Sequence, residues 1–79
     1  MLLDFDLEIL SRDWKDYELY TQQIRKEYWM YPGPIYRKGR REAMQHFLER
    51  EYIYQSELFR TEGEEKARAN IVAEIKSLS

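Results

Sequence analysis

The chain has 79 residues, of which 43% are apolar and 35% are charged, and this length leaves room for only one small domain with a single core. Cysteine is absent, which excludes disulfide bonds, thiolate metal sites and a cysteine nucleophile. A formal net charge of −2 gives no global bias toward nucleic acid or an anionic membrane, although a local basic patch can still bind either.

No apolar run approaches the length of about 18 residues that a membrane-spanning helix needs. The acidic N-terminus also lacks the basic start and apolar stretch of a signal peptide. We therefore expect a soluble, cytoplasmic protein that has no membrane among its partners.

The first strong signal along the chain is an amphipathic helix over residues 13–30. Ser11 or Asp13 can cap its N-terminus, and the YPGP motif at 31–34 ends it, because proline lacks an amide donor and disfavours helical geometry in the preceding residue. The apolar positions recur at spacings of three and four. They are Trp14, Tyr17, Tyr20, Ile24 and Tyr28.

A second helix is predicted over residues 34–50, where Pro34 suits the first helical turn. Gly39 lowers its stability by about 1 kcal/mol relative to alanine, so we expect either close packing at this glycine or a later start of the helix. The apolar face consists of Tyr36, Ala43, Met44, Phe47 and Leu48.

The segment 52–59 is ambiguous, because its first three residues favour an extended connection whereas the rest can form a short helical turn that packs Leu58 and Phe59. The TEGE motif at 61–64 fits a capping box with Thr61 as the cap, and this predicts a third helix to about residue 77. Its apolar stripe consists of Ala67, Ile71, Ile75 and Leu78.

Together these signals predict one all-α domain over residues 1–79. It should be a small bundle of three main helices, at about 13–30, 34–50 and 61–77, preceded by a short N-terminal helical turn.

Five stretches resemble, in order and spacing, the C-terminal portion of a family of predicted metal-dependent phosphohydrolases of the HD superfamily. The stretches are DFDLEIL, YTQQIRKEY, YRKGRREAMQHFLER, IYQSELF and EEKARANIVAEI. The resemblance covers nearly the whole chain. It implies a helical fold and identifies these residues as similar to a fragment of a larger HD-type domain.

The resemblance also implies a divalent metal bound by a histidine, a His-Asp pair and a later aspartate. Asp6 corresponds to the later aspartate, with Asp4 as the alternative, whereas the other ligands would lie upstream of this chain. The single histidine, His46, is followed by Phe47 and falls in the part that resembles a distal helix. Because hydrolytic metal sites need several convergent ligands, we expect no catalytic residue and no cofactor in the isolated chain, and a divalent metal only together with an upstream HD region.

The residues themselves leave plainer alternatives open. Asp4 and Asp6 alternate with leucine and phenylalanine, which is also typical of a solvated face on a short segment. His46 has no second ligand at metal-binding spacing, which favours a surface or packing role.

The YRKGRRE stretch at 36–42 is the best candidate for a phosphate or nucleic-acid contact. A helix turns by about 100° per residue, so its four basic side chains spread around the axis. Acidic residues nearby (Glu42, Glu49 and Glu51) can also neutralise them, which favours a solvated, salt-bridged face over phosphate binding. The basic residues are Arg37, Lys38, Arg40 and Arg41.

The resemblance further implies that aromatic faces covered by upstream helices in the family would be exposed here, and exposed apolar patches usually find a partner. We therefore expect a helical module without catalytic activity that binds a protein partner or self-associates, with a symmetric homodimer as the simplest outcome. The alternatives are a fragment of a metal-dependent phosphohydrolase and a weak nucleic-acid binder. The candidate interaction surface is Trp14, Tyr17, Trp29, Phe47 and Phe59.

Overall fold

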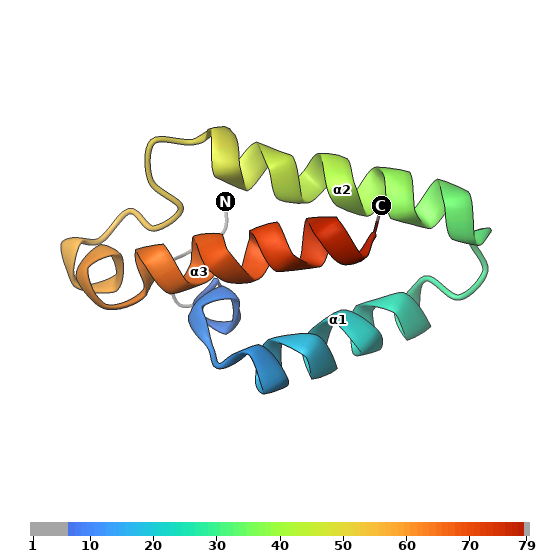
Figure 1. Cartoon of the computed structure of the whole chain (residues 1–79), viewed down its shortest axis with the longest axis horizontal. Coiled ribbons are helices and arrows are strands. Elements are labelled where there is room, and N and C mark those ends of the chain that lie inside the picture. Colours follow the sequence, from blue (N-terminus) through green and yellow to red (C-terminus); the bar gives the residue numbers. More distant parts are fainter. Residues whose placement is uncertain (1–6, 79) are drawn as a thin grey trace.

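The computed structural model of the protein describes residues 7–78, which form three α-helices and one short 3₁₀ helix without any strand. A 3₁₀ turn, η1 (Glu8–Ser11), leads into α1 (Trp14–Glu27), and α2 (Gly33–Glu49) and α3 (Glu57–Ser77) follow. The prediction of an all-α fold with three main helices and a short N-terminal turn is confirmed. In Figure 1, α1 and α2 lie on either side of α3, and the α1–α2 connection is at the right-hand end.

The core draws on every element and on the loop before α3. Its buried apolar residues are Leu7, Leu10, Tyr17, Met44, Ile53, Tyr54, Ala67 and Ile71. The predicted apolar stripe of the first helix is only partly buried, because Tyr17 has no exposed surface whereas Trp14 and Tyr28 at the two ends of α1 are exposed. None of the helices within residues 7–78 combines the length and the apolar character that crossing a bilayer requires.

The start of α3 differs from the sequence prediction. The helix begins at Glu57, one turn before Thr61, and Ser56 is its N-cap, with the hydroxyl oxygen accepting a hydrogen bond from the backbone N–H of Phe59 at 3.2 Å. The capping box predicted at Thr61 is therefore wrong. Glu64 lies inside α3, beyond its first turn, and its carboxylate accepts hydrogen bonds from the backbone N–H groups of Ile53 and Tyr54.

Both expectations for Gly39 are also wrong. The helix α2 starts before this residue, at Gly33, and a Cβ atom added at Gly39 would meet nothing within 4 Å. The close approach occurs at Gly63 of α3, where an added Cβ would lie 2.8 Å from the Ser11 Cβ. The absence of a side chain at Gly63 thus lets η1 pack directly on α3.

The N-terminus of α1 also differs from the sequence prediction. Asp13 is at the N-cap position of α1, but its side chain makes no capping hydrogen bond and forms an ion pair with Lys66 of α3. At the other end, α1 stops at Glu27, three residues before the predicted end. The Asp13 carboxylate therefore joins two helices rather than stabilising the start of one.

Candidate functional site

The most exposed apolar group of the described residues lies where α1 passes into α2. Trp29 is 74% exposed, and its neighbours in the connection and in the first turn of α2 are exposed as well. We name this group the aromatic tip, and it consists of Tyr28, Trp29, Met30, Tyr31 and Ile35. It lies at the right-hand end of the molecule in Figure 1.

Local hydrogen bonds join the backbone groups of the connection. The guanidinium of Arg25 donates to the carbonyl oxygens of Tyr28 at 2.9 Å and Tyr31 at 3.2 Å, and the N–H of Tyr31 donates to the Tyr28 carbonyl at 3.0 Å. Pro32 is the N-cap residue of α2 and has no backbone N–H that needs a partner. The exposed side chains are consequently presented by a fixed turn.

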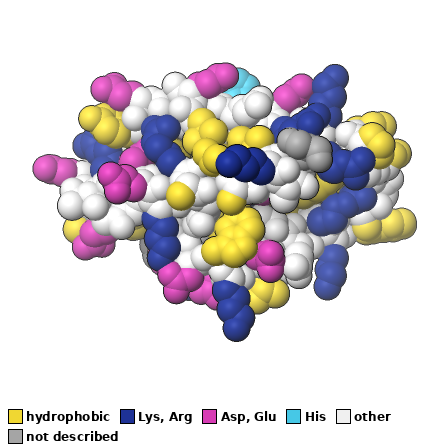
Figure 2. Space-filling model, viewed as in Figure 1, with side chains coloured by type: hydrophobic (Ala, Val, Ile, Leu, Met, Phe, Trp, Pro, Cys, Tyr) yellow, Lys and Arg dark blue, Asp and Glu magenta, His cyan; other side chains and the backbone are white. Residues whose placement is uncertain are grey.

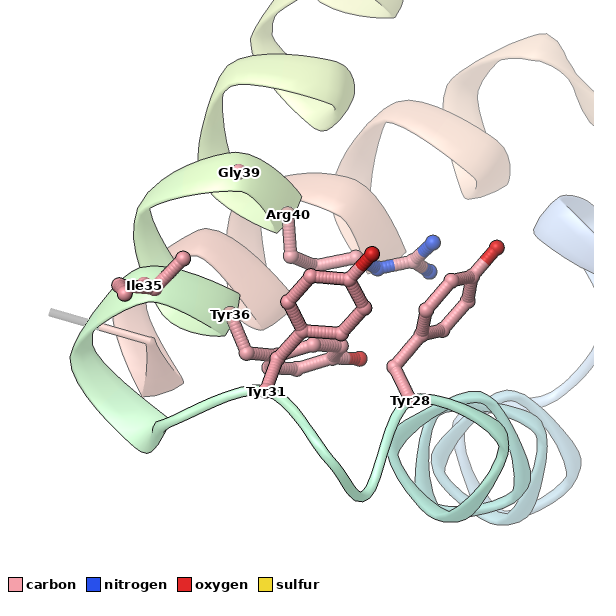
Figure 3. Close-up of a pocket in the computed structure, with 6 residues that line it drawn as sticks. All are labelled: Tyr28, Tyr31, Ile35, Tyr36, Gly39 and Arg40. Carbon is pink, nitrogen blue, oxygen red and sulfur yellow. The ribbon is translucent and has the colours of Figure 1, made fainter.

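A cavity of about 280 Å³ opens beside the tip. Figure 3 shows Tyr28, Tyr31, Tyr36 and Arg40 pointing into the same space between the end of α1 and the start of α2. Gly39 borders this space, and its missing side chain leaves it open. The cavity is therefore a largely aromatic recess with one guanidinium in its wall.

The aromatic walls pack on one another. The ring centroids of Tyr28 and Tyr31 are 5.9 Å apart, and those of Tyr28 and Tyr36 are 6.4 Å apart. The guanidinium carbon of Arg25 lies 4.6 Å from the centroid of the Tyr36 ring, in a cation–π contact. These contacts cover part of the ring faces that a planar ligand would otherwise use.

Behind the cavity, a buried polar cluster joins all three helices. The Arg40 Nε is 2.6 Å from Oε2 of Glu74, and the hydroxyl of Tyr17 donates to Oε1 of the same carboxylate at 2.5 Å. All three polar groups are thereby satisfied inside the protein, and among the described residues no buried side-chain nitrogen or oxygen lacks a partner. Arg40 thus faces the cavity but has its charge compensated from within.

The surroundings of this cluster shift the pKa values of two of its side chains. Burial of Tyr17, reinforced by its hydrogen bond to Glu74, raises the pKa of the phenol well above its ordinary value of 10.0. Burial opposes the charge of Arg40, but the hydrogen bond and the negative charge of Glu74 outweigh this effect and raise the pKa of the guanidinium. Tyr17 therefore stays neutral and Arg40 stays charged, as a structural linkage requires.

The charges of the chain are unevenly distributed around the tip. Residues 25–41 contain six of the 13 basic residues but only one of the 15 acidic residues, so this segment carries a formal charge of +5 and the remainder of the chain −7. Figure 2 shows basic and hydrophobic side chains together at the right-hand end, with acidic side chains mostly elsewhere. The small net charge of the whole chain conceals this separation.

The basic residues predicted for phosphate contact have different surroundings. Arg40 is paired with Glu74, whereas Arg37 and Lys38 are exposed and Arg41 is half-buried. Within residues 7–78, these last three side chains form no ion pair. The sequence predicted neutralisation by nearby acidic residues of α2 and the following loop, but the observed carboxylate comes from α3.

The predicted interaction residues do not form one surface. Tyr17 is fully buried and therefore cannot belong to an exposed face, and Phe47 and Phe59 are half-buried against the core. Trp14 and Trp29 are exposed but lie at opposite ends of α1.

The sequence contained one signal for the tip that periodicity overlooked, a run of four large apolar residues at 28–31 immediately before a proline, which exceeds what one helix face can bury.

Asp4, Asp6 and His46 are the metal-ligand candidates of the sequence. Asp4 and Asp6 lie outside the described residues. His46 is exposed, with its Nδ1 3.9 Å from a carboxylate oxygen of Glu49. Across residues 7–78 there is no group of three or more histidine, cysteine, aspartate or glutamate side chains suited to a metal ion, so the described part of the chain does not fit one.

Comparisons with protein-family models, with curated proteins and with solved structures give no match for this chain. The resemblance to HD-superfamily phosphohydrolases accordingly stays a prediction from the sequence.

Proposed function

We propose that this chain is a helical binding module, without catalytic chemistry of its own, whose binding surface is the aromatic tip. The observation that carries the proposal is the exposure of five large apolar side chains on a turn that hydrogen bonds hold in place. Exposed apolar groups of this kind mark interaction sites in soluble proteins more often than scattered single residues do.

The geometry around the tip supports binding of a partner with an apolar portion. The cavity of about 280 Å³ approaches the size range of small ligand pockets, and its walls are mainly aromatic. A prearranged turn also lowers the entropy that a partner must offset on association, because the side chains are already presented in one arrangement.

A triple substitution tests this function. In the tip variant, Trp29, Met30 and Ile35 are each replaced by serine. A matched control variant replaces three other exposed apolar side chains, Leu19, Leu58 and Val72, which lie outside the tip, by serine as well. Both variants should keep the helical circular dichroism of the wild type, because all six side chains are exposed and none belongs to the core.

Two measurements test binding at the aromatic tip. The first is sedimentation equilibrium from micromolar to millimolar concentration, which tests the homo-oligomer predicted from the sequence. The second is the fluorescence of anilinonaphthalene sulfonate, a probe with an aromatic portion and an anionic group. We expect the tip variant to lose probe binding and any self-association, and the control variant to retain them. Equal behaviour of the tip variant and the wild type in both measurements would contradict the proposal.

Nucleic-acid binding is a second candidate function. It is favoured by Arg37, Lys38 and Arg41, which form no ion pair with the described residues and follow the exposed aromatic residues of the tip closely in the sequence. Binding of a single-stranded oligonucleotide should then fall steeply with salt and weaken when Arg37 and Arg41 become alanine. Absent or salt-insensitive binding would remove this candidate.

A further inference from the structure

We propose that the partner of the aromatic tip is the surface of an anionic phospholipid bilayer. In this arrangement Trp29, Met30 and Ile35 enter the interfacial region, and the basic side chains Arg37, Lys38 and Arg41 contact the headgroups. The inference rests on the proposed function, because it names the partner of the same surface. The sequence prediction that excluded a membrane partner relied on the absence of a spanning segment, and peripheral attachment needs none.

The position of the tip suits insertion of one end of the molecule. The principal extents of the protein are 38 × 24 × 23 Å, and the α1–α2 connection lies at one end of the long axis (Figure 1). Trp29 and Met30 are 74% and 66% exposed on this turn. Tryptophan and tyrosine combine an apolar ring with a polar edge, which is the reason for their enrichment at membrane interfaces. The end of the molecule can thus enter a headgroup layer while the rest of the fold stays in water.

The charge distribution favours an anionic surface and sets the orientation. Residues 25–41 carry a formal charge of +5 and the remainder carries −7, and the Arg40–Glu74 ion pair neutralises one charge on each side, so an anionic bilayer still attracts the tip and repels the rest. The basic residues near the tip that form no ion pair with the described residues are Lys26, Arg37, Lys38 and Arg41. Long basic side chains can keep their charged ends in the headgroup layer while apolar neighbours lie deeper.

The same features argue against nucleic acid and against a second copy of the chain as the partner of the tip. Nucleic-acid stacking uses several free ring faces, but Tyr28 packs on both Tyr31 and Tyr36. Met30 and Ile35 have no ring, which leaves Trp29 as the most exposed ring of the tip. A symmetric homodimer through the tip would bring two segments of charge +5 together. A bilayer accepts aliphatic and aromatic side chains alike and supplies the opposite charge.

Vesicle co-sedimentation tests the inference with the full chain. We expect the wild type to bind vesicles of phosphatidylcholine and phosphatidylserine, to bind pure phosphatidylcholine vesicles weakly, and to be released by high salt. The tip variant should lose binding, and the control variant at Leu19, Leu58 and Val72 should retain it. Replacing Arg37, Lys38 and Arg41 by glutamine should weaken binding by at least about tenfold.

Fluorescence locates the inserted side chain. In a Trp14→Phe background, which keeps an aromatic ring on Tyr17, Trp29 is the only tryptophan. Its emission should shift to the blue with phosphatidylserine vesicles, and brominated lipids should quench it. Circular dichroism of every variant establishes that the fold is intact, so that a loss of binding reflects the surface.

The outcomes separate the inference from the proposed function. If the wild type does not bind phosphatidylserine vesicles, or if the folded tip variant binds them equally well, the membrane inference is overturned. If vesicle binding is absent while the tip variant still loses probe binding, self-association or oligonucleotide binding, the membrane inference fails and the proposed function stands. If the tip variant matches the wild type in all of these measurements, both fail.

Discussion

Two aromatic segments of similar composition differ in burial in this protein. In the segment 52–54, before α3, Ile53 and Tyr54 are completely buried and only Tyr52 is exposed. In the segment 28–31, between α1 and α2, all four apolar side chains are exposed. Both segments connect helices, so neither composition nor the type of connection accounts for the difference.

Polar contacts account for it. The Glu64 carboxylate accepts hydrogen bonds from the backbone N–H groups of Ile53 and Tyr54, and the Tyr54 hydroxyl donates to the carbonyl oxygen of Leu7 at 2.8 Å. In the connection at 28–31, Arg25 donates to two carbonyl groups, and all four side chains stay exposed although Tyr28 contacts the Tyr36 ring of α2. A loop can be buried only where its backbone polar groups find partners inside the protein, and the segment 52–54 has such partners.

The largest expected effect concerns the cluster that connects the tip to the core. Glu74→Ala should destabilise the protein by about 3–5 kcal/mol, because it leaves the buried guanidinium of Arg40 and the hydroxyl of Tyr17 without their carboxylate. Urea unfolding measures the change, and Glu65→Ala, an exposed position on the same helix, is the control. Equal stability of the two variants would show that the cluster does not stabilise the fold.

Two isoleucines provide a matched test of the comparison itself. Ile53 has no exposed surface, so Ile53→Ala should lower the free energy of unfolding by about 2–5 kcal/mol. Ile35 is 60% exposed, so Ile35→Ala should change it by less than about 0.5 kcal/mol. Denaturant titration of the two variants measures both values. A large loss for Ile35→Ala would mean that the tip is covered in solution.

Two glycines should respond to the same substitution with opposite signs. Gly63→Ala should destabilise the protein by about 1–3 kcal/mol, because the new Cβ would lie 2.8 Å from the Ser11 Cβ and neither backbone can move freely. Gly39→Ala meets open space within α2 and should stabilise the protein by up to about 1 kcal/mol through helix propensity. Thermal unfolding followed by circular dichroism gives both signs. Stabilisation by Gly63→Ala would contradict the close packing of η1 on α3.

The smallest expected effect is a dependence on alkaline pH. The pKa of the Tyr17 phenol is raised in the folded state, so the unfolded chain releases this proton at a lower pH. The stability that results is fully present below about pH 10. Above that pH, the free energy of unfolding falls by up to about 1.4 kcal/mol per pH unit. Burial also raises the pKa of Tyr36, at the cavity, in the same direction. Urea unfolding at about pH 9 and about pH 11 should show a flatter profile for Tyr17→Phe than for Tyr36→Phe. The same slope in both variants would contradict the assignment to Tyr17.

The helices themselves were predictable from the sequence. Apolar spacing and the proline motif at 31–34 act over a few residues, so the number of helices and most of their bounds follow from local rules. The start of α3 was not predictable in this way, because Ser56 and Thr61 are both acceptable caps locally. The choice depends on Glu64, which has partners in the preceding segment.

The candidate site was predictable only in part. The basic cluster at 37–41 and Trp29 are visible in the sequence, but the buried position of Tyr17 and the pairing of Arg40 with a residue 34 positions away are not. The sequence by itself determined an all-α chain with an aromatic turn and a segment of charge +5. Only the tertiary structure decided which aromatic segment is buried, because burial depends on hydrogen-bond partners that distant parts of the chain supply.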